Sequence, residues 1–137
     1  MPEARFPVEV VGGVPVVLAP EEIDITNAAA LRAALLRASA HGCGTLVVDM
    51  SGTQSCDASG IHVLVREHKR AQAGGGELLL VVTATAVLRV FAITGIDCII
   101  HNFSTLEEAL EQAPATRSAR SSPALTGYEP SPSLAPS

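Results

Sequence analysis

Aromatic residues are scarce in this chain of 137 residues, which contains three Phe, one Tyr and no Trp. A hydrophobic core must therefore consist of Val, Leu, Ile and Ala. These residues are numerous enough, because 47% of the chain is apolar. A chain of this length can bury such a core without disulfides or a structural metal, and it has room for one domain and little more.

Cysteines are few and follow no metal-binding pattern. Cys43, Cys56 and Cys98 form no CxxC motif and no Cys/His cluster with the spacing of a zinc site. The four histidines show no ligand spacing either. We therefore expect reduced thiols in a cytoplasmic protein that has no metal and no other cofactor.

Clusters of basic residues are also missing from the sequence. The nine Lys and Arg residues are scattered, and the formal net charge is −5. Because phosphate binding needs clustered cations, the sequence argues against nucleic acid and against an anionic membrane as partners. The longest apolar stretch, about residues 78–93, is interrupted by Thr83, Thr85 and Arg89. It falls short of a membrane span, and the N-terminus has no signal pattern, so we expect a soluble protein.

The composition changes at residue 114. Residues 114–137 are rich in Pro, Ser and Ala and have almost no periodic apolar residues. Such a segment buries too little surface to offset its ordering entropy. The sequence therefore predicts a folded domain over residues 1–113 and a disordered tail over 114–137.

Apolar patterns predict an alternation of strands and helices after an opening β-hairpin. The hairpin has strands 8–11 and 14–18 around the turn signal Gly12-Gly13. The pattern then predicts a helix capped by Thr26, a strand at 46–50, a helix from Asp57, a strand at 78–82, a helix ending at Gly95, a strand at 98–100 and a last helix opened by a capping box at 104–107. This order predicts an α/β fold with a mostly parallel, mixed sheet of about five strands and about four helices.

The segment Ser55–Ile61 is the main site candidate, because it joins a buried strand to the start of a helix. Sites in parallel sheets form at the carboxyl ends of strands, and a helix N-terminus stabilises a phosphate on a serine there. The alternative is structural, with Asp57 as an ordinary helix cap and Gly60 permitting close packing.

No enzyme motif fits this segment. A nucleophile elbow needs Gly two residues before its serine, where Ser59 has Asp57, and no Gly-Lys pair forms a phosphate loop. Asp49 ends a central strand, as the acceptor of a response-regulator receiver does. The acidic pair and the lysine that a receiver needs for magnesium phosphochemistry have no counterpart in place. We therefore predict a non-enzymatic protein in which Asp49 caps the loop after its strand.

Two segments, 47–52 and 56–64, together resemble the signature of STAS domains of the anti-sigma factor antagonist type. In that signature a strand and D-x-S precede D-S-S-G-[LI]-x-x-L, and this chain has Asp57-Ala58-Ser59-Gly60-Ile61. Further agreement lies at 22–24, 75–78, 87–96 and 103–110, so the resemblance covers about residues 6–113 in order.

The resemblance implies a STAS fold and a regulatory function in bacteria. Such an antagonist binds an anti-sigma factor, often a serine kinase, and so frees a sigma factor for transcription. The kinase then phosphorylates the serine after the Asp, which releases the antagonist. The alternative function is a STAS subunit of another assembly, such as a stress-signalling complex or a lipid or anion transport system.

This chain has Ala58 at the acceptor position of the family. Either Ser59 is the acceptor, or another residue such as Ser55 is, or the domain is locked in its binding form. The predicted partner surface comprises Asp24, Thr26, Asp57, Ala58, Ser59, Gly60, Ile61, His62 and Arg66. The alternative for part of this surface is an ordinary solvated helix face, formed by Arg66, Lys69 and Arg70.

Overall fold

The computed structural model describes residues 6–40 and 44–113. The predicted tail, residues 114–137, lies outside the described residues, as do His41 and Cys43. Within the described part, no helix is long and apolar enough to cross a membrane.

The chain opens with the predicted hairpin. Strands β1 (Val8–Val11) and β2 (Val14–Leu18) pair antiparallel, with Val11 opposite Val14. The two residues between them, Gly12 and Gly13, have φ angles of 60° and 85°. This left-handed pair closes a tight hairpin, as the Gly-Gly signal predicts.

Three further strands complete a five-stranded sheet. They are β4 (Leu46–Met50), β6 (Leu78–Val82) and β7 (His101–Phe103), and the strand order is β1-β2-β4-β6-β7. All pairs except β1 with β2 are parallel. The predicted mixed, mostly parallel sheet is therefore confirmed.

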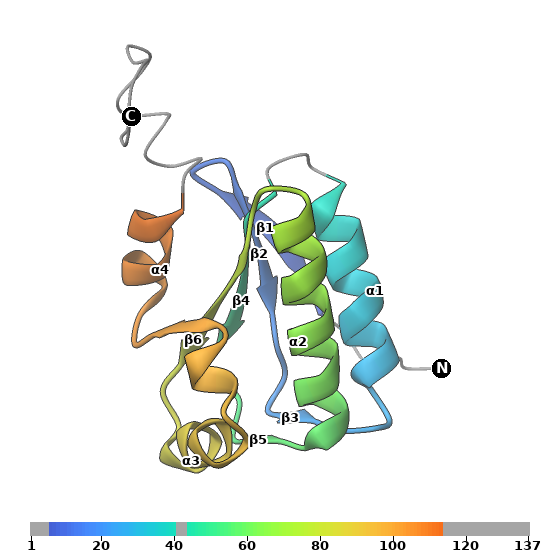
Figure 1. Cartoon of the computed structure of the whole chain (residues 1–137), viewed down its shortest axis with the longest axis vertical. Helices are drawn as coiled ribbons and strands as arrows, with labels where there is room; N and C mark the ends of the chain where they lie inside the picture. Colours follow the sequence, from blue (N-terminus) through green and yellow to red (C-terminus); the bar gives the residue numbers. More distant parts are fainter. Residues whose placement is uncertain (1–5, 41–43, 114–137) are drawn as a thin grey trace.

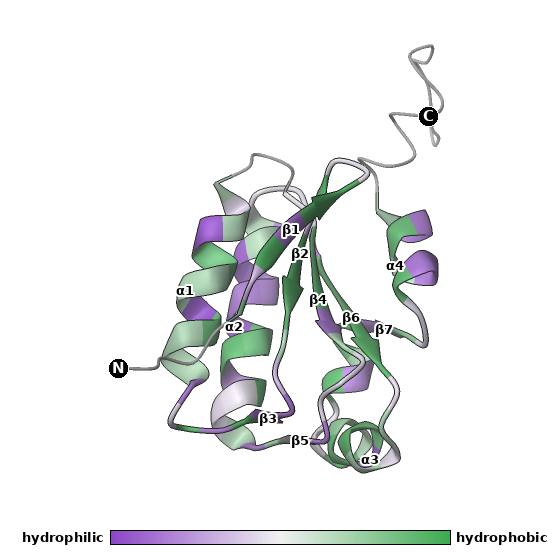
Figure 2. Ribbon diagram, turned by 180° about the vertical axis from the view of Figure 1, so that it is seen from behind, coloured by the Kyte–Doolittle hydropathy of each residue, from purple (hydrophilic) through white to green (hydrophobic). Residues whose placement is uncertain are grey.

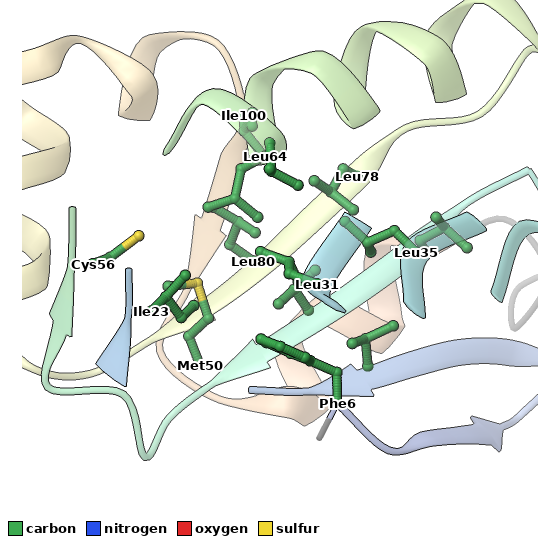
Figure 3. Close-up of a cluster of buried hydrophobic side chains, with 14 of the residues drawn as sticks. Phe6, Ile23, Leu31, Leu35, Met50, Cys56, Leu64, Leu78, Leu80 and Ile100 are labelled. Atoms are coloured by element: carbon green, nitrogen blue, oxygen red, sulfur yellow. The ribbon is translucent and has the colours of Figure 1, made fainter. Parts of the chain in front are cut away.

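Helices cover both faces of the sheet (Figure 1; Figure 2 shows the opposite view). Helices α1 (Ala28–Ser39) and α2 (Ala58–Ala73) pack on one face, and the short α4 (Leu106–Gln112) packs on the other. Successive side chains of β4 point to opposite faces of the sheet. Val48 belongs to the core under α1 and α2, and Val47 belongs to the core under α4. Figure 3 shows part of the larger core, which is aliphatic apart from Phe6, Phe91 and the sulfur-containing Met50 and Cys56.

Helix α3 (Thr85–Thr94) lies at the carboxyl-end edge of the parallel strands (Figure 1). Two short strands, β3 (Glu22–Ile23) and β5 (Ser55–Cys56), pair there as a separate parallel ribbon. The sequence pattern does not predict this ribbon, because two residues are too few to show alternation.

The predicted strand at 98–100 is wrong. Residues Ile96–Cys98 form a 3-10 helix, η1, and β7 begins only at His101. Gly95 ends α3 in a left-handed conformation. Ile96 in η1 and Ile100 after it are buried, while Ile99 stays exposed. The apolar residues at 98–100 therefore belong to the turn that connects α3 to β7, and not to a strand.

Two helix caps lie one residue after their predicted positions. The N-cap of α1 is Asn27 instead of Thr26, and its side chain makes no capping hydrogen bond. The N-cap of α4 is Thr105, whose Oγ1 accepts from the Glu108 N–H, while Glu108 Oε1 accepts from the Ser104 N–H. Glu108 therefore takes the place predicted for Glu107, but its side chain accepts from the residue before the N-cap, so only the Thr105 half of a capping box is formed.

His68 is a buried residue of α2 that fixes the start of β6. Its Nδ1 accepts a hydrogen bond of 3.1 Å from the Leu78 N–H. Burial lowers the pKa of His68 below its ordinary value of 6.5, and His101 lowers it further, while the Glu77 carboxylate opposes both. The imidazole is therefore held neutral, with Nδ1 as an acceptor.

We expect this histidine to make stability depend on pH. Because the pKa of His68 is lower in the folded state, the unfolded chain takes up a proton first as pH falls. The contribution is complete above pH 6.5 and is lost below it, by at most about 1.4 kcal/mol per pH unit. Denaturation at about pH 8 and about pH 5.5 should show a smaller pH effect in His68→Gln than in wild type. The exposed control His62→Gln should match wild type, and an unchanged pH effect in His68→Gln would contradict the prediction.

Candidate functional site

The β3–β5 ribbon brings two loops together at the carboxyl-end edge of the sheet. Ile23 pairs with Cys56, and the Asp57 N–H donates to the Ile23 carbonyl over 3.0 Å. Asp24 and Asp57, which follow the paired residues, therefore lie beside each other. We call the surface that they form with their neighbours at this edge of the sheet the rim. Two segments more than 30 residues apart in sequence thus form one surface.

Asp57 is the N-cap of α2, as the sequence predicts. Its Oδ1 accepts hydrogen bonds of 2.9 Å from the Ser59 N–H and 3.3 Å from the Gly60 N–H. These bonds satisfy two of the donors that a helix start leaves open. The cap fixes Ala58 as the first helical residue, directly on the rim.

Asp24 organises the second loop in a similar way. Its Oδ1 accepts from both the N–H and the Oγ1 hydroxyl of Thr26. The Thr26 hydroxyl is the main cause that lowers the pKa of Asp24, so the carboxylate is charged at neutral pH. Asn27 supports the loop by accepting from the Asp24 N–H and donating to the Glu22 carbonyl. Thr26 therefore positions a carboxylate and does not cap the helix.

Gly60 is buried where α2 crosses the ribbon. A Cβ at this position would lie 2.5 Å from Ile23 Cγ2 and 2.8 Å from Cys56 Sγ. Only glycine allows this approach, so the structural alternative for Gly60 is confirmed. The close approach places Ala58 and Ser59 beside the Asp24 loop.

The remaining predicted site residues differ in exposure. Ala58, His62 and Arg66 are exposed, and Ser59 is half-buried. Ile61 is also half-buried and packs against the main core. The structure therefore brings Asp24, Thr26, Asp57, Ala58 and Ser59 together at the rim, continues them along α2 through His62 and Arg66, and turns Gly60 and Ile61 inward.

A small groove of about 190 Å³ runs along this rim between the ribbon and α3. Ile23 and Cys56 line it from the ribbon, and Ala86 and Val90 line it from α3. Asp24 and Asp57 lie among its polar lining residues, together with Gln54 and Ser55. The arrangement offers an apolar floor beside two carboxylates.

Several contributors to this rim, Gln54 among them, were missed by sequence reasoning. Ala86 and Val90 come from α3, and nothing in their local pattern points to the groove. Ile25 is 76% exposed in the loop between Asp24 and Thr26. An isolated large apolar residue within a polar loop is the one signal that could have identified it.

Asp49 has the structural role that the sequence predicts. Its Oδ1 accepts a hydrogen bond of 3.0 Å from the Ser51 N–H and so caps the loop after β4. Among residues 6–40 and 44–113, no three His, Cys, Asp or Glu side chains form a group that could hold a metal ion.

Cys56 has an unreactive thiol although it lines the groove. Burial, with a smaller contribution from the Asp57 carboxylate, raises the pKa of Cys56 to about 12. Cys98 is exposed. We expect iodoacetamide to alkylate Cys98 in the folded protein and Cys56 only after unfolding, because the thiolate is the nucleophile. Peptide mapping by mass spectrometry measures this difference, and equal labelling of both thiols in the folded protein would contradict it.

Comparison with known proteins places this geometry in a family. The family model described as STAS domain matches residues 5–109. A Thermotoga neapolitana protein assigned to the anti-sigma factor antagonists is 29% identical over 108 residues, which are 78% of this chain and 96% of that protein.

Solved structures agree with the family model. The crystal structure of an anti-sigma factor antagonist from Mycobacterium paratuberculosis has 29% sequence identity and a TM-score of 0.72, over 79% of this chain and 92% of that chain. The crystal structure of a Thermotoga maritima protein assigned the same role has 27% identity and a TM-score of 0.73, over 79% of this chain and 93% of that chain.

Proposed function

The chain belongs to the STAS domain family, and on that premise we propose that it is an anti-sigma factor antagonist. It acts in the cytoplasm by binding, without catalysis. Its partner is an anti-sigma factor of the serine-kinase type, and binding frees a sigma factor and so regulates transcription. The names of its relatives and the exposed rim around Ala58 support this function.

The rim residues suit recognition of a protein with a cationic group. Within the described residues, the hydrogen bonds of the Asp24 and Asp57 carboxylates all use Oδ1. The Oδ2 atom of each carboxylate is therefore open to a Lys or Arg of the partner. Ile25 adds an exposed apolar contact beside them, and the apolar floor of the groove accepts the stem of a long cationic side chain.

Regulation at this rim differs from the phosphorylation switch of the family. Ala58 is exposed at the acceptor position but has no hydroxyl, and Ser59 is half-buried in the capped first turn. We therefore propose that the chain binds its partner constitutively. Incubation with the cognate kinase and ATP, followed by mass mapping, tests this point, and a stoichiometric phosphate on Ser59 or Ser55 would overturn it.

A large charged side chain at the acceptor position should weaken partner binding strongly. Ala58→Glu leaves the fold intact because an acidic side chain is favourable in the first turn of a helix, by about 0.3–1 kcal/mol. It places a longer side chain, and a charge that must be desolvated, where the proposed interface has only a methyl group, and this steric and desolvation cost should outweigh attraction to a cationic group of the partner. We expect a loss of affinity of about 100-fold, equivalent to about 2.7 kcal/mol.

The measurement is a pull-down from host extract, followed by titration of the purified anti-sigma factor with each variant. Ala92→Glu, the same substitution at an exposed position of α3, is the matched control and should bind like wild type. Capture of a transporter component instead of an anti-sigma factor, or equal binding by Ala58→Glu and wild type, would refute the proposed function.

A further inference from the structure

The basic residues are scattered along the sequence but gathered in space. Five of the six Lys and Arg in the described residues lie on α1 and α2, and all five are exposed: Arg32, Arg37, Arg66, Lys69 and Arg70. Glu67 is the only acidic residue of these two helices, and it is 3% exposed. One side of an acidic protein is therefore cationic, and we name it the α1–α2 face.

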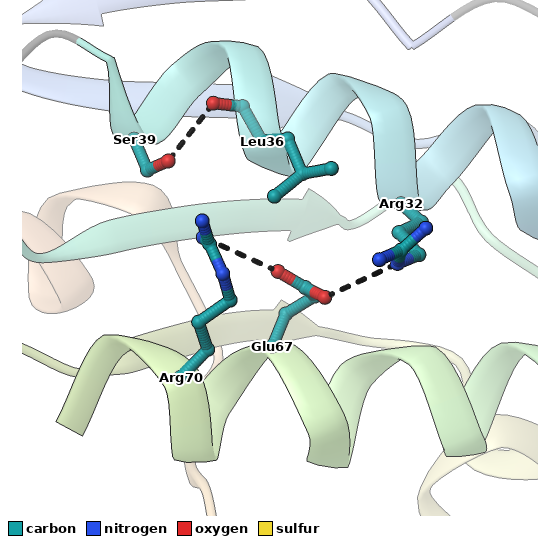
Figure 4. Close-up of polar contacts among 5 residues, drawn as sticks. All are labelled: Arg32, Leu36, Ser39, Glu67 and Arg70. Atoms are coloured by element: carbon teal, nitrogen blue, oxygen red, sulfur yellow. Dashed lines mark hydrogen bonds and ion pairs between the residues drawn. The ribbon is translucent and has the colours of Figure 1, made fainter. Parts of the chain in front are cut away.

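Glu67 partly neutralises this face and holds the two helices together (Figure 4). Its Oε2 lies 3.7 Å from Arg32 Nε on α1, and its Oε1 lies 3.8 Å from Arg70 Nη1 on α2. Both guanidinium groups keep half or more of their side chains exposed. The two helices therefore have one carboxylate for five cationic side chains. Arg66 and Lys69 have no ion pair among the described residues.

The exposed cations of α2 form a stripe that begins at the rim. His62, Arg66 and Lys69 are spaced four and three residues apart, so they share one side of the helix. With Val65 they line a hollow of about 390 Å³. His62 lies one turn after Ala58, so the stripe continues the proposed interface without a break.

From this face we infer that α1 and α2 dock an acidic helix of the anti-sigma factor, an inference that rests on the proposed function. Opposite charge at short range supplies complementarity and speeds association. Exposed Ala29 and Ala33 on α1 leave room for a helix to approach. The rim would then bind a cationic group of the partner, while the α1–α2 face binds its acidic helix.

Other polyanions fit this face less well. The exposed large apolar residues of the described part are Val10, Ile25, Leu88, Ile93 and Ile99, and none lies on α1 or α2. The face therefore has no apolar anchor for a bilayer and no aromatic platform for bases. The net charge of −5 repels an extended polyanion beyond the face itself.

The test is the affinity of the purified anti-sigma factor for Arg66→Glu and for Arg89→Glu, the same reversal at an exposed position of α3. At about 50 mM salt, Arg66→Glu should weaken binding about tenfold, and this loss should shrink to about twofold at about 500 mM because salt screens exposed charges. Arg89→Glu should bind like wild type.

A second measurement locates the acidic partner element. Lys69 is the only lysine of the chain. A carbodiimide forms an amide between an amine and a carboxylate in direct contact, so cross-linking the complex should join Lys69 to an Asp or Glu of the anti-sigma factor. Lys69→Arg keeps the positive charge but removes the amine, so it should lose this cross-link.

The outcomes separate this inference from the proposed function. If Ala58→Glu abolishes binding while Arg66→Glu binds like Arg89→Glu and Lys69 forms no cross-link, the α1–α2 face is not the docking site and the proposed function stands. If wild type binds no anti-sigma factor, both fail. Binding of wild type, but not of Arg66→Glu, to phosphatidylglycerol vesicles or to duplex DNA at physiological salt would replace the acidic helix with a lipid or nucleic-acid ligand.

Discussion

Replacing Phe91 by alanine is expected to lower the free energy of unfolding by about 3–5 kcal/mol. Phe91 is fully buried and is the largest such side chain of the described residues. It joins the main core from α3, the helix that packs against β5 and η1. Truncation removes apolar burial and leaves a cavity that the sheet and the ribbon cannot fill. Urea denaturation monitored by circular dichroism measures the loss.

Leu88→Ala is the control for this substitution, because Leu88 lies in the same helix and is 41% exposed. It should cost less than about 1 kcal/mol. Since α3 supplies Ala86 and Val90 to the groove, Phe91→Ala should also weaken partner binding under conditions in which it remains folded. Equal stability losses in the two variants would show that Phe91 does not anchor α3.

Gly60→Ala is expected to destabilise the protein by about 1–3 kcal/mol, the cost of overpacking a core. Helix propensity alone predicts the opposite sign, a gain of about 1 kcal/mol, for glycine to alanine within a helix. The steric term should dominate because Ile23 and Cys56, which the new Cβ would meet, are themselves buried. The displaced N-terminus of α2 would also carry Ala58 away from the Asp24 loop.

Gly52→Ala is the matched control, since a Cβ at Gly52 meets nothing within 4 Å. Its unfolding free energy should stay close to that of wild type. A double-mutant cycle identifies the contact, because Gly60→Ala should cost less in a Cys56→Ala background, where Sγ is absent. A stabilising effect of Gly60→Ala in wild type would show that α2 does not approach the ribbon as closely as described.

Much of the fold could be predicted from the sequence because its causes are local. The Gly12-Gly13 turn closes the hairpin, the apolar runs at 46–50 and 78–82 form buried strands, and Asp57 caps α2. In each case the chemistry lies within a few residues of the structure that it determines. The strand predicted at 98–100 is wrong because the same apolar residues also suit a buried turn. Only the packing of the chain after Gly95 decides between a strand and a turn.

The candidate site was predicted in outline and completed by packing. The sequence identified Asp24 and the Asp57–Ser59 segment, and the Ile23–Cys56 pairing brings them together. It did not identify Val90, because α3 reaches the groove through the burial of Phe91. Ala58, by contrast, is visible in the sequence alone, and it removes the acceptor hydroxyl whatever the fold.

The sequence by itself determined the order of the main strands and helices, the Asp57 cap of α2 and the absence of a hydroxyl at residue 58. Only the tertiary structure decided which side chains share one face of the surface. Five cations that are scattered in sequence share one face because α1 and α2 pack side by side with their apolar sides on the sheet. Local periodicity fixes which side of each helix is buried, but the neighbour of a helix is set by contacts between distant residues, and no short stretch of sequence encodes them.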